Sequence, residues 1–187
     1  MKVDIFNTNQ KYKIIYADPP WNFSSKQLQK ENGKRFNSLE KVYHTEKTKD
    51  MKQWNIKNIC DNDCAMFMWT TDAHIKEAIE LMSAWGFNYV TVAFVWSKQS
   101  KNAKEVYTLG AWTLKNCELC LFGTRGQMLK YKKSNSVKQL VKAERTKHSK
   151  KPDIVYSLIE ELFGDVPRIE LFARQQVEGW DCWGNEV

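Results

Sequence analysis

The feature that most constrains the fold is Asp18-Pro19-Pro20-Trp21, which directly follows the apolar run 12–17. That run contains aromatic and β-branched residues and predicts a buried strand. A carboxylate just beyond the end of such a strand lies where open α/β sheets bind their ligands. The two prolines fix φ at successive positions and provide no N–H, so the neighbouring carbonyls are preset hydrogen-bond acceptors. Such acceptors beside an indole suit a planar substrate with an amino group; the plainer alternative is a tight turn with a buried tryptophan.

The rest of the chain alternates apolar runs with helical patterns. Buried strands are predicted at 64–69, 89–96, 115–122 (which Gly123 is expected to end) and 168–174, with an edge strand at 3–6. Helices are predicted at 48–59 with Thr48 as its cap, at 72–85 and at 152–163, the last two ended by Gly86 and Gly164. This alternation predicts an α/β fold, with a mostly parallel sheet covered by helices on both faces. The length of 187 residues predicts a single domain, 1–187.

The charge balance favours a polyanionic partner. The 29 lysines and arginines exceed the 22 acids and leave a net charge of +7, with a pI near 9.1. A basic domain with 8 tryptophans is typical of proteins that bind polyanions. No apolar run approaches the ~18 residues that a membrane-spanning helix needs, and there is no signal peptide. The sequence therefore predicts a soluble, cytoplasmic protein without a membrane partner.

The cysteine pattern does not indicate a metal site. Cys117 and Cys120 have the spacing of a metal or redox pair, but both lie in the predicted strand 115–122. Residues three apart on a strand point to opposite faces, so the two thiols would not converge. The chain has only 3 histidines, which are far apart in the sequence, and we therefore expect no metal.

Three polar segments, 22–47, 97–112 and 123–151, are expected to be long loops, and loops of this length are often functional. The stretch from Lys130 to Lys151 is the most basic, with nine lysines and arginines against Glu144 alone. It is either a solvated face or a surface that follows a phosphate backbone. Tyr131 within it favours the second interpretation.

In this setting the tetrapeptide resembles the catalytic motif of the MT-A70 family of adenine-N6 methyltransferases. The resemblance covers nearly the whole chain in the family's order, through Tyr43-His44-Thr45, Phe67-Met68-Trp69, Trp96-Ser97-Lys98, Lys151-Pro152-Asp153, Glu170-Leu171-Phe172-Ala173-Arg174 and Trp183-Gly184-Asn185-Glu186. It implies a circularly permuted, Rossmann-like class I methyltransferase fold. The catalytic strand would lie near the start of the chain and the cofactor strand near its end.

The resemblance also implies S-adenosylmethionine as the methyl donor. Asp18 would accept a hydrogen bond from its ammonium group, and Lys151 would face its carboxylate. The other residues implied in cofactor binding are Asn185 and Arg174 at the ribose, helped by Gln176 and Glu186, and Asp4 and Ile5 at the adenine. The family's human catalytic member has His-Asn in place of Gln176-Val177. This chain therefore departs from the family's pattern at the implied ribose contacts.

The acceptor implied by the resemblance is the exocyclic amino group of adenine. Asp18 and the Pro19 carbonyl would orient that group, and the base would be flipped out or single-stranded. The candidate substrate contacts are Trp21 and Tyr43 as stacking partners, Glu118, Trp112, and Lys130, Lys132 and Lys133 at the phosphates.

Several alternatives remain open at this point. DNA is favoured over RNA as the substrate. RNA stays an alternative, because no sequence feature indicates whether a 2′-hydroxyl is recognised. A non-catalytic nucleic-acid-binding subunit is disfavoured by the intact Asp18-Pro19-Pro20-Trp21. Cytosine is disfavoured because Trp21 replaces the tyrosine of the broader amino-methyltransferase class. The sequence does not choose between a monomer, a homodimer and a heterodimer.

Overall fold

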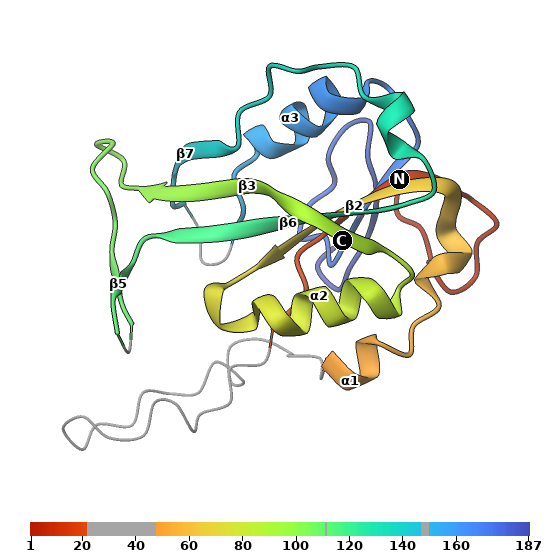
Figure 1. Cartoon of the computed structure of the whole chain (residues 1–187), viewed down its shortest axis with the longest axis horizontal. Helices are drawn as coiled ribbons and strands as arrows, with labels where there is room; N and C mark the ends of the chain where they lie inside the picture. Colours follow the sequence, from red (N-terminus) through yellow and green to blue (C-terminus); the bar gives the residue numbers. More distant parts are fainter. Residues whose placement is uncertain (22–47, 111, 147–149) are drawn as a thin grey trace.

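The computed structural model describes residues 1–21, 48–110, 112–146 and 150–187. Its centre is a seven-stranded sheet with the order β7-β3-β6-β2-β1-β8-β9 (Figure 1). The strands are β1 (Tyr12–Ala17), β2 (Cys60–Thr70), β3 (Asn88–Gln99), β6 (Cys117–Arg125), β7 (Leu140–Glu144), β8 (Arg168–Leu171) and β9 (Asp181–Trp183). The predicted α/β class is confirmed.

The sheet is mostly parallel, as expected. β1 pairs in parallel with both β2 and β8, β8 with β9, and β3 with β7. Only β6, which lies between β2 and β3, is antiparallel to its neighbours. The carboxyl ends of the six parallel strands therefore lie along one side of the sheet, which we call the carboxyl edge, and their amino ends lie along the opposite amino edge.

The order of the strands confirms the permuted topology. β1 comes first in the chain yet lies in the middle of the sheet, and its partner β8 comes from near the end of the chain. Ile14 pairs with Arg168 and Ala17 with Leu171. The strand that carries Asp18 and the strand that leads to Arg174 are thus direct neighbours, which brings the two ends of the sequence motif set together.

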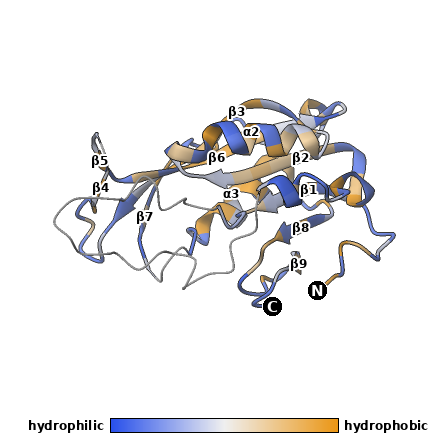
Figure 2. Cartoon of the chain, turned by 90° about the horizontal axis from the view of Figure 1, so that it is seen from below, coloured by the Kyte–Doolittle hydropathy of each residue, from blue (hydrophilic) through white to orange (hydrophobic). Residues whose placement is uncertain are grey.

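Helices α2 (Ile75–Ala84) and α3 (Ile154–Phe163) cover opposite faces of the sheet (Figures 1 and 2). Successive side chains of a strand point to opposite faces, and β1 follows this rule: Ile15 packs in the cluster that contains α2, whereas Ile14 and Tyr16 pack in the cluster that contains α3. The central strands β1 and β8 and the second half of β2 are therefore buried on both sides, and ligands can approach them only at the edges of the sheet.

Two predicted elements at the amino-terminal side are wrong in detail. Residues 3–6 form a turn, because the Asp4 carboxylate accepts a hydrogen bond from the Phe6 N–H (3.0 Å), and pairing is limited to one bridge between Lys2 and Cys182. The predicted helix 48–59 is reduced to α1 (Thr48–Met51) and a 3₁₀ turn (Ile56–Ile59). The Met51 carbonyl accepts the Trp85 indole N–H (2.8 Å), so tertiary packing replaces further helix at this point.

Two further differences lie around β6. Gly123 does not end this strand but lies within it, where a Cβ atom would be 2.6 Å from the Met82 side chain of α2. A glycine in a strand thus marks close approach of a helix rather than a stop. The predicted loops also contain short elements: β4 (Thr108–Leu109), a 3₁₀ turn (Met128–Tyr131) and β7. β4 forms a hairpin with β5 (Leu114–Lys115), which takes up the start of the predicted strand 115–122. Within the described ranges, no helix is long and apolar enough to cross a membrane.

Candidate active site

Asp18 follows β1 directly, at the carboxyl edge and between the ends of β2 and β8. Its Oδ2 accepts a hydrogen bond from Lys151 Nζ at 2.7 Å, and both side chains are largely buried, with exposed fractions of 17% and 12%. Burial raises the pKa of Asp18 above its ordinary value, although the neighbouring Lys151 opposes this rise. The carboxylate is thus held at a strand end where solvent has little access.

Lys151 also belongs to a chain of alternating charges. Its Nζ lies 3.2 Å from Glu118 Oε2, and Glu118 Oε1 lies 2.5 Å from Lys98 Nζ. Burial alone would raise the pKa of Glu118, but Lys151 and Lys98 together hold that pKa below its ordinary value. Burial likewise lowers the pKa of Lys151, but Asp18 and Glu118 outweigh it and raise that pKa. Basic and acidic groups thus alternate along this chain, in the order Lys98, Glu118, Lys151 and Asp18.

Buried aromatic side chains support this charge chain. Lys151 Nζ lies 5.8 Å from the centre of the Trp69 ring, and Trp69 Nε1 donates a hydrogen bond to the Tyr16 hydroxyl at 2.6 Å. Trp69 is fully buried in β2, and Tyr16 is 2% exposed in β1. Because both rings are fixed by packing and by their own hydrogen bond, they hold Lys151 with little freedom to move.

Trp21 is fixed within the protein rather than projecting from it. Its ring stacks on His74, with centroids 5.8 Å apart, and its Nε1 donates to the Trp69 carbonyl at 3.0 Å. The Trp21 backbone N–H donates to the Pro19 carbonyl at 2.9 Å, which leaves that oxygen a second lone pair. The indole is 6% exposed, so its stacking on a substrate stays a prediction. Tyr43, the other predicted stacking residue, lies outside the described residues.

A second group of polar residues lies where the loops after β8 and β9 meet. The Ala173 N–H donates to the Trp183 carbonyl at 2.9 Å, and a Cβ atom at position 184 would lie 2.2 Å from the Ala173 carbonyl oxygen. Only Gly184 permits this approach. The contact places Arg174 beside Glu186, with Nε and Oε1 3.7 Å apart, and Asn185 directly precedes Glu186 in the loop after β9.

Comparison with known proteins assigns this arrangement to a family. The profile of the MT-A70 family matches residues 12–186. The chain belongs to the MT-A70 family. It is 37% identical over 189 residues to type II methyltransferase M.MunI from Mycoplasma sp, covering 95% of this chain and 78% of that protein. It is 27% identical over 181 residues to the human N(6)-adenosine-methyltransferase catalytic subunit METTL3, covering 95% of this chain but only 28% of METTL3.

Membership of the MT-A70 family makes this chain a methyltransferase and implies a methyl donor. The zebrafish (Danio rerio) METTL3 subunit is similar at 28% identity, and again the chain spans only 28% of its length. The match begins at β1 and ends in the loop after β9, so it includes both groups of polar residues described above. In the part of the chain that the structure describes, no group of three or more His, Cys, Asp or Glu is placed to hold a metal ion.

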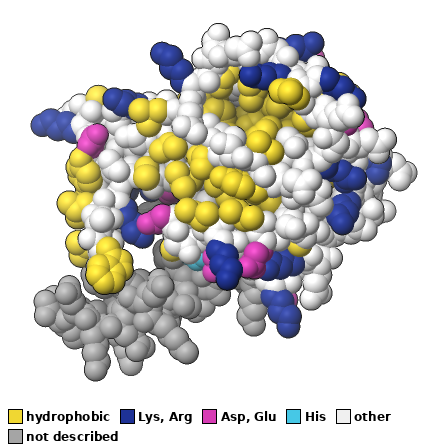
Figure 3. Space-filling view, viewed as in Figure 1, with side chains coloured by type: hydrophobic (Ala, Val, Ile, Leu, Met, Phe, Trp, Pro, Cys, Tyr) yellow, Lys and Arg dark blue, Asp and Glu magenta, His cyan; other side chains and the backbone are white. Residues whose placement is uncertain are grey.

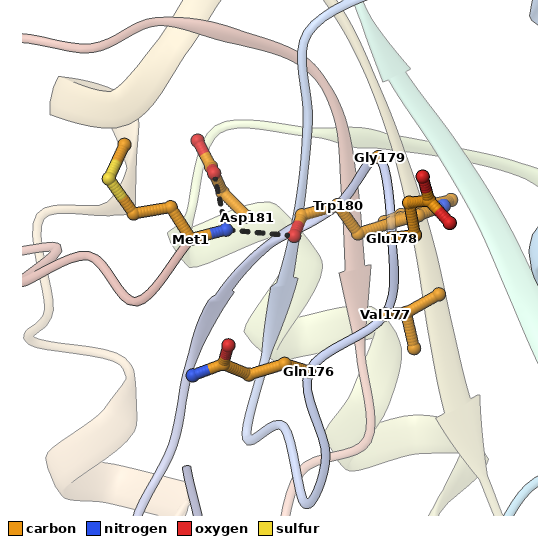
Figure 4. A pocket seen from close by; sticks show the side chains of 7 residues that line it. All are labelled: Met1, Gln176, Val177, Glu178, Gly179, Trp180 and Asp181. Carbon is orange, nitrogen blue, oxygen red and sulfur yellow. Dashed lines mark hydrogen bonds and ion pairs between the residues drawn. The ribbon is translucent and has the colours of Figure 1, made fainter.

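The remaining candidate cofactor residues of this MT-A70 chain are more scattered. Ile5 is buried in the core, so only its backbone could meet a ligand, and the exposed Asp4 bonds to its own turn. Gln176 lines a cavity of about 420 Å³ with residues 177–181 and Met1 (Figure 4). That cavity lies at the amino end of β9, where the Met1 ammonium group pairs with Asp181 at 2.9 Å. The predicted roles of these three residues stay predictions.

The three lysines expected at the phosphates do not lie beside Asp18. Lys130 pairs with Asp63 at 2.6 Å, and the Tyr131 ring next to it contacts Lys13, at 4.4 Å from Nζ to centroid. Asp63 and Lys13 are at the amino ends of β2 and β1, so this turn lies at the amino edge. Lys13 and Asp18 are five residue steps apart, which corresponds to about 16 Å of extended strand.

Lys132 and Lys133 follow the same turn and keep the same position. Lys132 Nζ donates to Asn135 at 2.7 Å, and the Lys133 backbone N–H donates to the Leu162 carbonyl at the end of α3. Lys130, Lys132 and Lys133 therefore lie at the amino edge, away from Asp18, and their role at the phosphates stays a prediction. A basic composition gives the charge of a segment but does not say which edge of the sheet it reaches.

Two charged residues near the site, Lys98 and Glu170, were not predicted as site residues from the sequence. Lys98 was noted only as part of a motif, yet it closes the charge chain through Glu118. Glu170 lies inside β8, is 8% exposed and accepts a hydrogen bond from the Tyr156 hydroxyl at 2.8 Å. Burial raises the pKa of Glu170 to about 7. An acid between apolar residues in a predicted buried strand is the sequence signal that could have identified it.

Proposed function

We propose that this MT-A70 methyltransferase acts as a single domain, 1–187, and transfers a methyl group from S-adenosylmethionine to N6 of adenine in DNA. The observation that carries the proposal is the buried pair of Asp18 and Lys151 at the carboxyl edge. METTL3 is named an N(6)-adenosine-methyltransferase, which supports the acceptor atom. DNA is proposed over RNA because the similarity to the type II methyltransferase M.MunI is stronger, at 37% against 27% identity.

The charges of the site fit S-adenosylmethionine. Its methionine part carries an ammonium and a carboxylate, and Asp18 and Lys151 offer the opposite charges at neighbouring positions. Arg174, Asn185 and Glu186 offer donors and acceptors for the ribose hydroxyls, on two loops held close by Gly184. S-adenosylmethionine, when bound, supplies an activated methyl group. Asp4, Ile5 and Gln176 complete the proposed cofactor contacts.

The residues of the protein would prepare the acceptor. The N6 lone pair of adenine is delocalised into the ring, which makes the amino group a poor nucleophile. In the proposed mode, the Asp18 carboxylate and the free lone pair of the Pro19 carbonyl accept its two N–H bonds, and the lone pair becomes localised on nitrogen. Such positioning is worth roughly 7–11 kcal/mol of barrier lowering in favourable cases. Trp21 and Tyr43 would contact the base, and Glu118 would hold Lys151 in place.

A base in a duplex cannot reach a site enclosed in this way. The target adenine would have to leave the stack, or the substrate would have to be single-stranded. The net charge of +7 supports binding to a nucleic acid through its phosphates. The intact Asp18-Pro19-Pro20-Trp21 and the charge chain behind it argue against a non-catalytic binding subunit, because binding alone does not need a buried Asp18–Lys151 pair.

The decisive experiment supplies labelled S-adenosylmethionine together with single- and double-stranded DNA and RNA, digests the products and identifies the labelled nucleoside. We expect N6-methyladenine in DNA, and a loss of at least 100-fold in Asp18→Asn with an unchanged thermal midpoint. The matched control is Asp165→Asn, since Asp165 is 98% exposed in its ion pair with Arg168 at the amino edge. Label in RNA alone would reassign the substrate, and the absence of label in every nucleic acid would contradict the proposal.

A further inference from the structure

The β4–β5 hairpin projects from the main sheet as a separate two-stranded ribbon (Figure 1). Hydrophobic side chains gather over it (Figure 3). The exposed fractions are 51% for Tyr107, 81% for Leu109, 98% for Trp112 and 61% for Leu114. Four large apolar side chains left in water on one ribbon mark a binding surface rather than ordinary surface composition.

The root of this hairpin is joined to the charge chain of the active site. The Lys98 N–H donates to the Asn116 carbonyl at 2.8 Å, and the Val106 N–H donates to the Lys98 carbonyl at 3.0 Å. The Lys98 side chain pairs with Glu118. Lys115, at the end of β5, pairs with Asp72 at 2.9 Å, just beyond the carboxyl end of β2. The hairpin is therefore anchored at the same edge of the sheet as Asp18.

We propose that the β4–β5 hairpin is a wedge that inserts Trp112 into duplex DNA beside the target adenine. The proposal rests on the proposed function, because only a flipped base leaves a gap to fill. An aromatic side chain restores part of the stacking that the departed base loses, and apolar wedges between base steps are an established device of DNA-binding proteins. Lys101 and Lys104 next to the hairpin are exposed, and Glu105 is the single acid in the sequence 97–116, a charge balance that suits flanking phosphates.

A second copy of the chain is a poorer occupant for this surface. Taking about 250 Å² as a ceiling for each of the four side chains and scaling by their exposed fractions gives at most about 730 Å². Each partner in a stable protein–protein interface contributes roughly 800 Å². Two hairpins with the same lysines would also repel each other, whereas DNA offers the opposite charge along the whole ribbon.

The test compares methyl transfer to one unmethylated plasmid DNA, native and heat-denatured, so no recognition sequence has to be known. We expect Trp112→Ala to lower the ratio of duplex to single-strand rates by about 5- to 150-fold, the range expected for one lost stacking contact. Trp112→Phe should recover most of the ratio. Leu129→Ala, which removes another highly exposed apolar side chain (82%, against 98% for Trp112) at the amino edge, should leave the ratio unchanged.

An unchanged ratio in Trp112→Ala would overturn the wedge, and so would a parent dimer that this substitution converts to a monomer in sedimentation. If the parent transfers no methyl group to either DNA, the proposed function fails instead. The ratio of duplex to single-strand binding affinities, measured in parallel, then decides the wedge: a loss in Trp112→Ala alone supports it, and equal ratios overturn it.

Discussion

Replacing Glu170 by glutamine is expected to remove a pH dependence of stability that the fold imposes on β8. The Glu170 side chain is 8% exposed and accepts the Tyr156 hydroxyl hydrogen bond. Burial raises its pKa from 4.5 to about 7, against the lowering effect of that hydrogen bond and with help from the charges of Asp18 and Asp153. A glutamine has nearly the same shape and can still accept the hydrogen bond through its Oε1.

The direction of this pH dependence follows from the number of protons that the folded and the unfolded states bind. Between pH 4.5 and 7 the unfolded chain releases the Glu170 proton while the folded protein keeps it. The unfolded state is therefore favoured as pH rises through this window, and the free energy of unfolding falls. Each pKa unit corresponds to 1.36 kcal/mol, so the loss amounts to about 3 kcal/mol, complete above pH 7. Below pH 4.5 parent and variant should differ little.

Urea unfolding at pH 5, 6, 7 and 8 measures this difference directly. The parent should lose stability relative to Glu170→Gln as the pH rises, by about 3 kcal/mol over the whole window. Glu178→Gln is the matched control, because Glu178 is exposed near the amino end of β9; its curve should follow that of the parent. If the free energies of unfolding of the parent and of Glu170→Gln change in parallel with pH, Glu170 is not the source of the pH dependence.

Three further predictions concern the two edges of the sheet. Glu118→Gln should lower turnover by 10-fold or more with the thermal midpoint retained, because Lys151 and Lys98 lose their shared carboxylate; normal turnover would count against the charge chain. Gly184→Ala should weaken S-adenosylmethionine binding in calorimetry, since its Cβ would lie 2.2 Å from the Ala173 carbonyl oxygen; unchanged affinity would remove these loops from the cofactor site. The triple variant Lys130→Ala, Lys132→Ala, Lys133→Ala should keep the parent's dependence of DNA affinity on salt concentration. A flatter slope of log affinity against log salt would instead support the role of these lysines at the phosphates.

Much of the fold could be predicted because burial leaves a pattern in the sequence. The runs that became the end of β1 and the second half of β2 are almost continuously apolar, since both faces of the sheet are covered there. The antiparallel direction of β6 could not be predicted, because strand periodicity is the same in either direction. The two-residue strands β4 and β5 are too short for any period, and Gly123 suggested a stop although its role is to admit Met82.

For the site, too, some residues could be predicted from sequence motifs, whereas contacts that depend on the folded sheet could not. Asp18 and Lys151 were predicted to serve one ligand, and they lie 2.7 Å apart. The links through Glu118 to Lys98 depend on which residues of β6 and β3 face each other, and that register is a tertiary property. The position of Lys130 at the amino edge could not be predicted for a related reason: its partner Asp63 is distant in sequence, and only the folded sheet shows which edge they share.

The central position of β1 has a consequence for the synthesis of the protein. Ile14 can pair with β2 as soon as residues near Ala65 have left the ribosome, but its other partner, Arg168, is made 103 residues after Ala65. At 5–20 residues per second, one side of β1 waits on the order of 10 s with its backbone N–H and C=O groups unpaired. Throughout this interval β1 is an open, apolar sheet edge, the kind of surface that other chains can extend. The order of elements that brings Asp18 and Arg174 together thus delays closure of the site until β8 has been made.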